Sequence, residues 1–159
     1  IGVQLLCQSS EEGDTACIGI FDNRVRKFDT LFAEAGILLP DATGTAAPLS
    51  DAGSCSARQA DVPADAAILR PTGRLKIPHM GWNSVENLRS GLFTGIDQGA
   101  YVYYVHSFAP EVNADTIATT TYGVPFSAAI RKDNFYGTQF HPEKSASIGA
   151  QILQNFLTL

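Results

Sequence analysis

The sequence lacks any apolar run close to the roughly 20 residues with which a helix crosses a bilayer, and it shows no basic-then-apolar targeting segment. Cysteine is scarce: the three cysteines form no CxxC pair and no metal-ligand spacing with the three histidines. Neither a disulfide framework nor a zinc site is therefore predicted. We expect a cytoplasmic protein without a bound metal.

An excess of basic residues is also absent. The formal net charge is -5, and lysine and arginine stand singly or in short groups, which argues against a surface that neutralises nucleic-acid phosphates. A content of 45% hydrophobic and 17% charged residues over 159 positions is typical of one globular domain. We expect a small-molecule or protein partner, and no nucleic acid or membrane.

The first part of the chain predicts a helix, a hairpin and a long loop. Ile1–Ser10 has the apolar spacing of a helix, and Cys17–Phe28 alternates like a hairpin whose turn contains Asn23 at positive φ. Residues 41–71 are rich in Ala, Asp, Ser, Gly and Pro and predict an exposed loop or insertion, with a short helix at Asp65–Leu69 as the alternative.

The remainder predicts a run of strands closed by a helix, with no internal repeat. The final segment, Ala146–Leu159, has the pattern of an amphipathic helix, with Ile148, Ile152, Leu153, Phe156 and Leu157 on its apolar side. The expected ordered segments before it are Leu75–Asn83, Gly99–Phe108, Asp115–Thr121, Phe126–Lys132 and Phe135–Phe140.

The most informative segment places an imidazole and a carboxylate two residues apart, at His141 and Glu143. Alternate side chains of an extended segment project to the same side, so Glu143 can orient the ring of His141 and stabilise its protonated form. Pro142 ends the strand because it lacks an amide donor. The alternative is a structural histidine, but the adjacent carboxylate favours a general base.

A nucleophile for this base is predicted just before the first residue of the sequence. Gly2 and the helical pattern after it fit the half of a nucleophile elbow that follows the reactive residue, which would stand immediately before Ile1. Cys7, Cys17 and Cys55 are alternatives, but none stands at a strand-to-helix turn. Cys7 and Cys17 are expected to be small buried hydrophobic residues.

Six motifs together resemble the glutamine amidotransferase subunit of imidazole glycerol phosphate synthase. The Phe-His-Pro-Glu part is common to class I amidotransferases, whereas Pro-His-Met-Gly-Trp-Asn and Ala-Thr-Thr-Thr-Tyr-Gly are typical of the histidine-biosynthesis branch. The motifs are Ile1–Leu6, Ser9–Gly13, Lys76–Asn83, Tyr104–Phe108, Ala118–Gly123 and Gly137–Ser145.

The resemblance implies an α/β class I amidotransferase domain of flavodoxin-like, three-layer type, with a mixed, mostly parallel sheet flanked by helices. Residues 1–159 would be the C-terminal portion of that single domain. The implied activity is hydrolysis of glutamine to glutamate and ammonia, without a cofactor. The implied partner is a cyclase subunit, in a heterodimer, which uses the ammonia to make imidazole glycerol phosphate and an aminoimidazole carboxamide ribonucleotide.

Site residues also follow from the resemblance. A cysteine just before Ile1 would form a thioester with glutamine, assisted by His141 and Glu143, and Ile1 would supply one oxyanion amide. Residues 1–159 alone are expected to be inactive because they lack that cysteine. The positions that match the glutamine-binding residues of the family are Gln4, Glu12 and Ser107.

Pro78, Met80 and Trp82 match a segment that faces the cyclase, where an apolar lid would keep ammonia from protonation. Read without the motif, Trp82 would be a core aromatic residue. His79 and His106 are expected to be structural or interfacial.

The chain departs from the family pattern at three places. Phe108 stands where Tyr is usual, Asn23 stands where Gly is frequent, and the 41–71 segment is longer than usual. Two alternatives remain from sequence: another class I amidotransferase, serving pyridoxal, guanylate or anthranilate synthesis, or a non-catalytic module that docks to a synthase.

Overall fold

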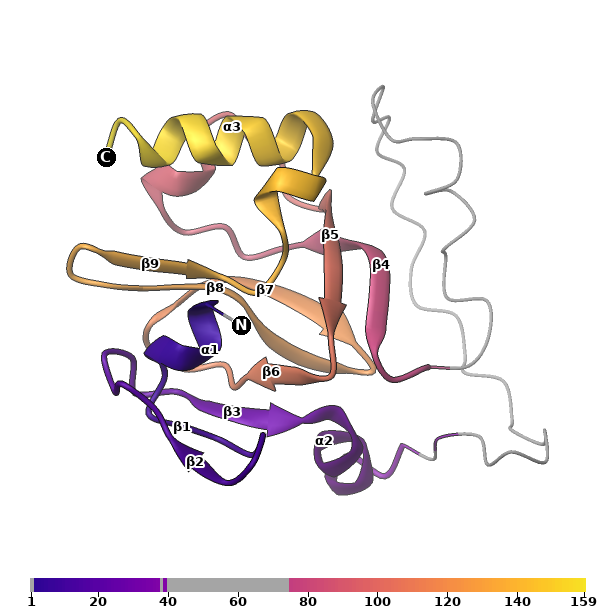
Figure 1. Cartoon of the computed structure of the whole chain (residues 1–159). Helices are drawn as coiled ribbons and strands as arrows, with labels where there is room; N and C mark the ends of the chain where they lie inside the picture. Colours follow the sequence, from indigo (N-terminus) through magenta and orange to yellow (C-terminus); the bar gives the residue numbers. More distant parts are fainter. Residues whose placement is uncertain (1, 38, 40–74) are drawn as a thin grey trace.

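The structure is a computed structural model that describes residues 2–37, 39 and 75–159 (Figure 1). The predicted loop at 41–71, its alternative helix, Cys55 and Ile1 lie outside the described residues. Within those ranges, the helices are too short or too polar to span a bilayer.

The first described elements build a four-stranded sheet in the order β2-β1-β3-β6. Helix α1 (Gly2–Leu6) leads to β1 (Ser9–Ser10), β2 (Thr15–Ala16), β3 (Arg24–Lys27) and helix α2 (Phe28–Glu34), and β6 (Phe108–Pro110) joins later. β1 pairs with β3 in parallel, whereas β2 and β6 pair antiparallel to their neighbours.

Three expectations for this region are wrong. The first helix ends at Leu6 because Ser9 and Ser10 pair with β3 instead of continuing it. No hairpin turns at Asn23, since β3 pairs with β1, and the Asn23 side chain is buried, donating to the Glu111 carbonyl oxygen at 2.6 Å. Asn23 also does not have a positive φ. Helix α2 was not predicted from the sequence.

The predicted strands of the second part are present. β4 (His79–Val85) and β5 (Ala100–His106) form an antiparallel pair, and β7 (Thr116–Tyr122), β8 (Val124–Lys132) and β9 (Phe135–Thr138) form a three-stranded antiparallel sheet. The short helix η2 (Gly91–Phe93) lies between β4 and β5. Helix η3 (Pro142–Lys144) and α3 (Ala146–Phe156) complete the chain.

Helix α3 has a narrower buried face than its sequence pattern predicts. Ile152 is buried, but Leu153, Phe156 and Leu157 are exposed by 46%, 49% and 78%. Gly149 and Asn155 occupy the buried side instead, and the Asn155 amide donates to the carbonyl oxygens of Leu92 and Thr94.

The expected α/β class with a mixed sheet is confirmed. The described strand pairs are, however, mostly antiparallel rather than mostly parallel, with β1 and β3 as the parallel pair. The reason is local: β7, β8 and β9 follow one another through short turns, and such turns join antiparallel strands.

The core lies between these strands and the helices. One cluster of buried side chains is centred on Phe28, Tyr104 and Phe126, and a second one under α1 contains Val3, Cys7 and Ile130. These two clusters fix α1, β5 and β9 relative to one another, and the candidate site lies where those three elements meet.

Candidate functional site

His141 stands between the end of β9 and the start of η3. Its backbone N–H donates to the Tyr103 carbonyl oxygen of β5 at 2.9 Å, and its carbonyl oxygen accepts from the Ser145 hydroxyl at 2.6 Å. The Ser145 hydroxyl oxygen in turn accepts from the Tyr103 N–H at 3.0 Å. The backbone of His141 is therefore fixed to the middle of β5.

The His141 ring is oriented by Glu143, which is on the first turn of η3. The two atoms that meet are Nδ1 of His141 and Oε1 of Glu143, at 2.8 Å. The backbone N–H of Glu143 and the His141 contact lower the pKa of the Glu143 carboxyl, so Glu143 is ionised and accepts the hydrogen bond. Because Nδ1–H donates, Nε2 is the nitrogen left to take a proton.

Close packing of η3 against α3 supports this geometry. A Cβ atom on Gly149 would lie 1.8 Å from the Pro142 carbonyl oxygen, so only glycine permits the approach. The Gly149 N–H donates to the Ser145 carbonyl oxygen at 2.9 Å. The turn that carries His141 and Glu143 is thus held from the helix side as well as from β5.

A cavity of about 650 Å³ opens beside His141. Its walls come from α1, the turn after β1, the corner between β5 and β6, and the β9–η3 segment. The residues predicted from sequence as catalytic or glutamine-binding all line it, although they are far apart in the chain: Gln4, Glu12, Ser107, His141 and Glu143. Ile1, the predicted source of an oxyanion amide, lies outside the described residues.

Gln4 is buried in the cavity wall with a defined orientation. Its Nε2 donates to the Phe108 carbonyl oxygen and to Oε1 of Gln139, both at 3.0 Å. With both amide hydrogens used, Oε1 is the part of the side chain that can accept from a ligand. No donor to that oxygen is found among the described residues.

Helix α1 lies close to the segment that contains His141 because β9 contains a glycine. A Cβ atom on Gly137 would lie 2.6 Å from Cγ2 of Val3, so the absence of a side chain lets α1 pack directly on β9. Four residues after Gly137 the chain reaches His141. The N-terminal end of α1, where sequence places the nucleophile, therefore shares one cavity with the predicted base.

Two buried histidines form a hydrogen-bond network that was not predicted from the sequence. His79 Nδ1 and His106 Nε2 are 2.9 Å apart, and His106 Nδ1 lies 2.8 Å from the Phe108 carbonyl oxygen. Because a carbonyl only accepts, His106 donates through Nδ1 and His79 donates to His106. The Asn83 amide nitrogen lies 3.3 Å from Nε2 of His79 and completes a row of hydrogen bonds from β4 to the cavity wall.

Burial keeps both imidazoles neutral. It lowers the pKa of His79 to about 3, with a further contribution from His106, and lowers that of His106 to about 4. The only available sequence signal is that β4 and β5 each contain one histidine at an inward position. Their pairing depends on strand register, which places His79 opposite His106.

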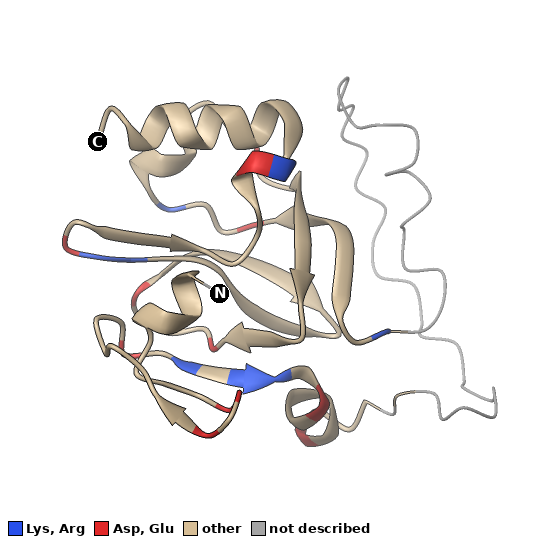
Figure 2. Ribbon diagram, in the orientation of Figure 1, with Lys and Arg blue, Asp and Glu red and all other residues tan. Residues whose placement is uncertain are grey.

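The residues predicted to face a partner do not line the cavity. Pro78 and Met80 are exposed, and Trp82 is half-buried with its ring 5.9 Å from that of Tyr103. Met80 pairs with Val105 across the two strands, and Val105 is itself a cavity residue. The outward face of β4 and β5 is therefore continuous with the rim of the cavity, and neither strand carries a lysine, arginine, aspartate or glutamate (Figure 2).

The described cysteines do not line the cavity. Cys7 is buried, its thiol donates to the Val3 carbonyl oxygen at 3.4 Å, and burial raises its pKa to about 12. Cys17 is partly exposed, which differs from the expected burial. Within the same ranges, no three His, Cys, Asp or Glu side chains gather as a metal site would require.

Comparison with known proteins places this chain in a family. The model of the family described as "Glutamine amidotransferase class-I" matches residues 1–159. A Bacteroides fragilis protein called "Imidazole glycerol phosphate synthase subunit HisH" is 40% identical over 159 residues, which are 100% of this chain and 61% of that protein. A Bacteroides thetaiotaomicron protein of the same name is 39% identical over the same shares.

A third relative of that name, from Escherichia coli strain K12, is 57% identical over 86 residues, or 54% of this chain and 44% of its own length. The chain spans about three fifths of the length of the Bacteroides relatives. The match over every residue, with the predicted site residues gathered in one cavity, leads to one conclusion: this chain belongs to the class I glutamine amidotransferase family.

Proposed function

We propose that the protein containing this chain is the glutaminase subunit of an imidazole glycerol phosphate synthase, and that it hydrolyses glutamine to glutamate and ammonia. The observation that carries the proposal is the oriented His141–Glu143 pair, with its 2.8 Å contact, at the edge of a cavity that also contains Gln4, Glu12 and Ser107. The names of the relatives, which match across the whole chain, support the same assignment.

The proposed chemistry is acyl transfer through a thioester. A cysteine thiolate immediately before Ile1 attacks the amide carbon of glutamine, and His141 gives the thiol proton to the departing nitrogen, which leaves as ammonia. His141 then takes a proton from water, which attacks the thioester and releases glutamate and the thiol. Glu143 stabilises the positive charge on the ring during both steps.

The amino-acid end of glutamine would be held on the opposite wall. Gln4 Oε1 accepts a hydrogen bond from the bound glutamine. The Glu12 carboxylate pairs with its α-ammonium group, and the Ser107 hydroxyl contacts its α-carboxylate. Ser107 suits this role because its backbone is fixed, its carbonyl oxygen accepting from the Phe28 N–H at 3.1 Å. These contacts place the amide carbon beside His141.

The partner would cover the uncharged face of β4 and β5. Pro78, Met80 and Trp82 lie on or beside this face, and Val105 links it to the cavity rim. Ammonia must keep its lone pair to act as a nucleophile, and an apolar cover prevents its protonation by water. This arrangement supports a cyclase subunit as the partner.

The test is a glutaminase assay of the full-length protein, alone and with its co-expressed cyclase subunit. We expect glutamate release from glutamine, increased by the partner. Binding to the cyclase without glutamate release would support the non-catalytic module instead. Release that depends on the synthase of another pathway would favour another class I amidotransferase.

A further inference from the structure

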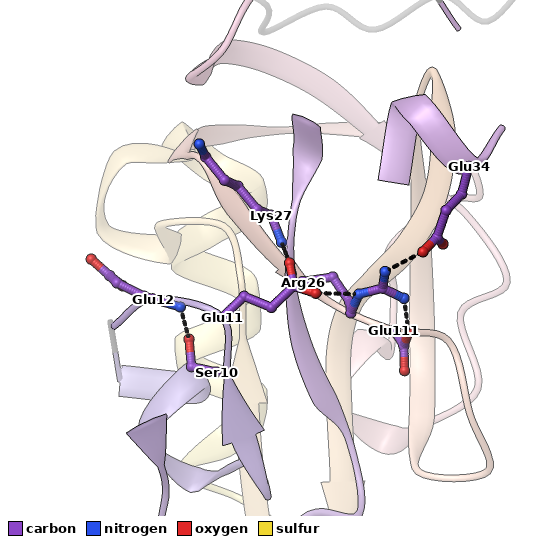
Figure 3. Close-up of polar contacts among 7 residues, drawn as sticks. All are labelled: Ser10, Glu11, Glu12, Arg26, Lys27, Glu34 and Glu111. Carbon is purple, nitrogen blue, oxygen red and sulfur yellow. Dashed lines mark hydrogen bonds and ion pairs between the residues drawn. The ribbon is translucent and has the colours of Figure 1, made fainter. Parts of the chain in front are cut away.

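Two neighbouring glutamates on the turn between β1 and β2 point in opposite directions. Figure 3 shows the side chain of Glu11 directed toward Arg26 and that of Glu12 directed away from it. Glu12 lines the cavity, whereas Glu11 does not. One carboxylate is thus held by the protein and the other faces the proposed ligand.

Glu11 is attached to β3 by three hydrogen bonds. Its Oε1 accepts from Nε of Arg26 and its Oε2 from the Lys27 N–H, both at 2.7 Å, and its own N–H donates to the Val25 carbonyl oxygen at 2.9 Å. The next residue is fixed too, since the Glu12 N–H donates to the Ser10 hydroxyl oxygen at 3.1 Å. The direction in which Glu12 leaves the backbone is therefore set by these contacts.

Arg26 is itself immobilised by two further elements. Its Nη2 lies 2.6 Å from Glu34 of α2, and its Nη1 lies 2.9 Å from Glu111, which follows β6. A guanidinium has its donors in one rigid plane, so three carboxylates on three sides define its position. Arg26 stands on β3, which lies between β1 and β6, and its side chain is only 18% exposed.

The two glutamates differ in their charged partners. Burial acts to raise the pKa of Glu11, but the Lys27 N–H and the Arg26 guanidinium outweigh it and lower that pKa, so Glu11 is an ionised partner of Arg26. Glu12 forms no salt bridge within the described part of the chain. Its negative charge remains for a ligand cation.

We propose that Arg26 and Glu11 are positioning residues for substrate recognition, which hold the turn so that the Glu12 carboxylate meets the α-ammonium group of the substrate. This inference rests on the proposed glutaminase function. Glu11 and Arg26 do not touch glutamine; they act through Glu12. The ligand class that they select is an amide carrying an α-ammonium group.

The first test measures kcat and KM for glutamine in the full-length protein with its cyclase partner, for Glu11→Gln and Arg26→Ala. The KM should rise at least about tenfold with kcat little changed, which is the size of one lost hydrogen bond to a charged group. Asp29→Asn is the matched control, because it removes the ion pair of the Lys27 and Asp29 side chains, which contacts neither Arg26 nor Glu11, and its KM should stay at the wild-type value.

The second test uses glutaramate, the analogue of glutamine without the α-amino group. Glu11→Gln should not change kcat/KM for glutaramate, because Glu12 then has no ammonium group to bind. Arg26→Lys keeps the charge without the three-way contact, and its KM for glutamine should lie between wild type and Arg26→Ala. This milder variant keeps the test decisive should Arg26→Ala not fold.

An unchanged KM for glutamine in Glu11→Gln and Arg26→Lys would overturn the inference. So would an equal loss of kcat/KM with glutamine and glutaramate, which would indicate a general structural role. Glu12→Gln separates this from failure of the proposed function. If Glu12→Gln raises the KM and Glu11→Gln does not, only the inference is wrong; if the wild type releases no glutamate, both are wrong.

Discussion

His141 is held at its backbone by Tyr103 and Ser145 and at its ring by Glu143, so its orientation does not depend on a bound ligand. Glu143 is the most exposed of these groups, with 61% of its side chain accessible. A solvated carboxylate contributes less to folding than one in the core. Its contribution should therefore be found in the reaction rather than in stability.

At this scale the first prediction concerns Glu143→Gln. The amide can still accept from Nδ1 of His141, but it cannot balance the positive charge that forms on the ring during reaction. We expect kcat to fall by about tenfold or more, with KM and the melting temperature little changed. Steady-state kinetics of the full-length protein measure kcat and KM, and thermal melts measure the melting temperature. An unaltered kcat would contradict this role.

The buried histidine pair leads to a second residue-scale prediction. His79 and His106 have an ordinary pKa of 6.5 when unfolded, and burial lowers these values to about 3 and about 4 in the fold. As the pH falls below about 6.5, the unfolded chain binds protons that the folded protein excludes. Each histidine should therefore remove roughly 1 kcal/mol of stability per pH unit between about pH 6 and pH 4.

Urea unfolding at pH 7, 6 and 5 measures this slope. A His79→Gln variant, with one fewer titrating ring, should show a shallower loss of stability on acidification than the wild type, whatever its stability at pH 7. Identical slopes for the two proteins would mean that the fold does not lower the pKa of His79.

At the scale of elements, η3 and α3 meet at Gly149, where there is no room for a side chain. Gly149→Ala would place a Cβ atom 1.8 Å from the Pro142 carbonyl oxygen, so η3 or α3 must move. We expect a loss of about 2 kcal/mol or more in unfolding free energy, a typical size for overpacking, together with reduced kcat. Ser147→Ala, at an exposed position of the same helix, should be within about 0.5 kcal/mol of wild type.

The strands that the sequence predicted correctly are those with a sustained local signal. Ala100–His106 is rich in residues that favour strands, and β7 to β9 are separated by short turns, so local propensity and tertiary structure agree. The two-residue strand at Ser9–Ser10 has no such signal, because it exists only through its pairing with β3. Helix α2 was missed for a related reason: it has seven residues and no side-chain cap at Lys27.

At the scale of the whole molecule, charge is unevenly distributed over the residues that the structure describes. Charged residues gather around β3, α2 and the turn after β1, whereas β4, β5 and α3 have none (Figure 2). The first region contains the ion pairs of Arg26, and the second offers an apolar surface next to the cavity. This division supports the proposal that the partner docks on β4 and β5.

Met80→Glu tests that docking surface. Met80 is 57% exposed, so a charge there should change the stability of the free subunit little, but it should weaken binding of the cyclase by at least about tenfold if the residue is covered. Leu157→Glu is the control: it is 78% exposed at the end of α3 away from β4 (Figure 1). Calorimetric titration with the cyclase compares the two, and equal affinities would exclude this face.

The candidate site was more predictable than the fold around it. The His141–Glu143 pair was predicted from a local motif, and Gln4, Glu12 and Ser107 were predicted from the family resemblance. The structure brings all five to one cavity, and their roles stay predictions. The network of His79 and His106 depends on strand register, and the contacts of Arg26 join three separate elements. Interactions of that kind become visible only once the chain is folded.

The most direct measurement of the central claim is kcat for glutamine hydrolysis by the full-length protein and its His141→Ala variant, each with the proposed cyclase partner. If His141 is the general base, kcat should fall by at least about 10²-fold, the usual size of such an effect, while glutamine still binds. A variant that keeps most of the wild-type kcat would remove His141 from the mechanism.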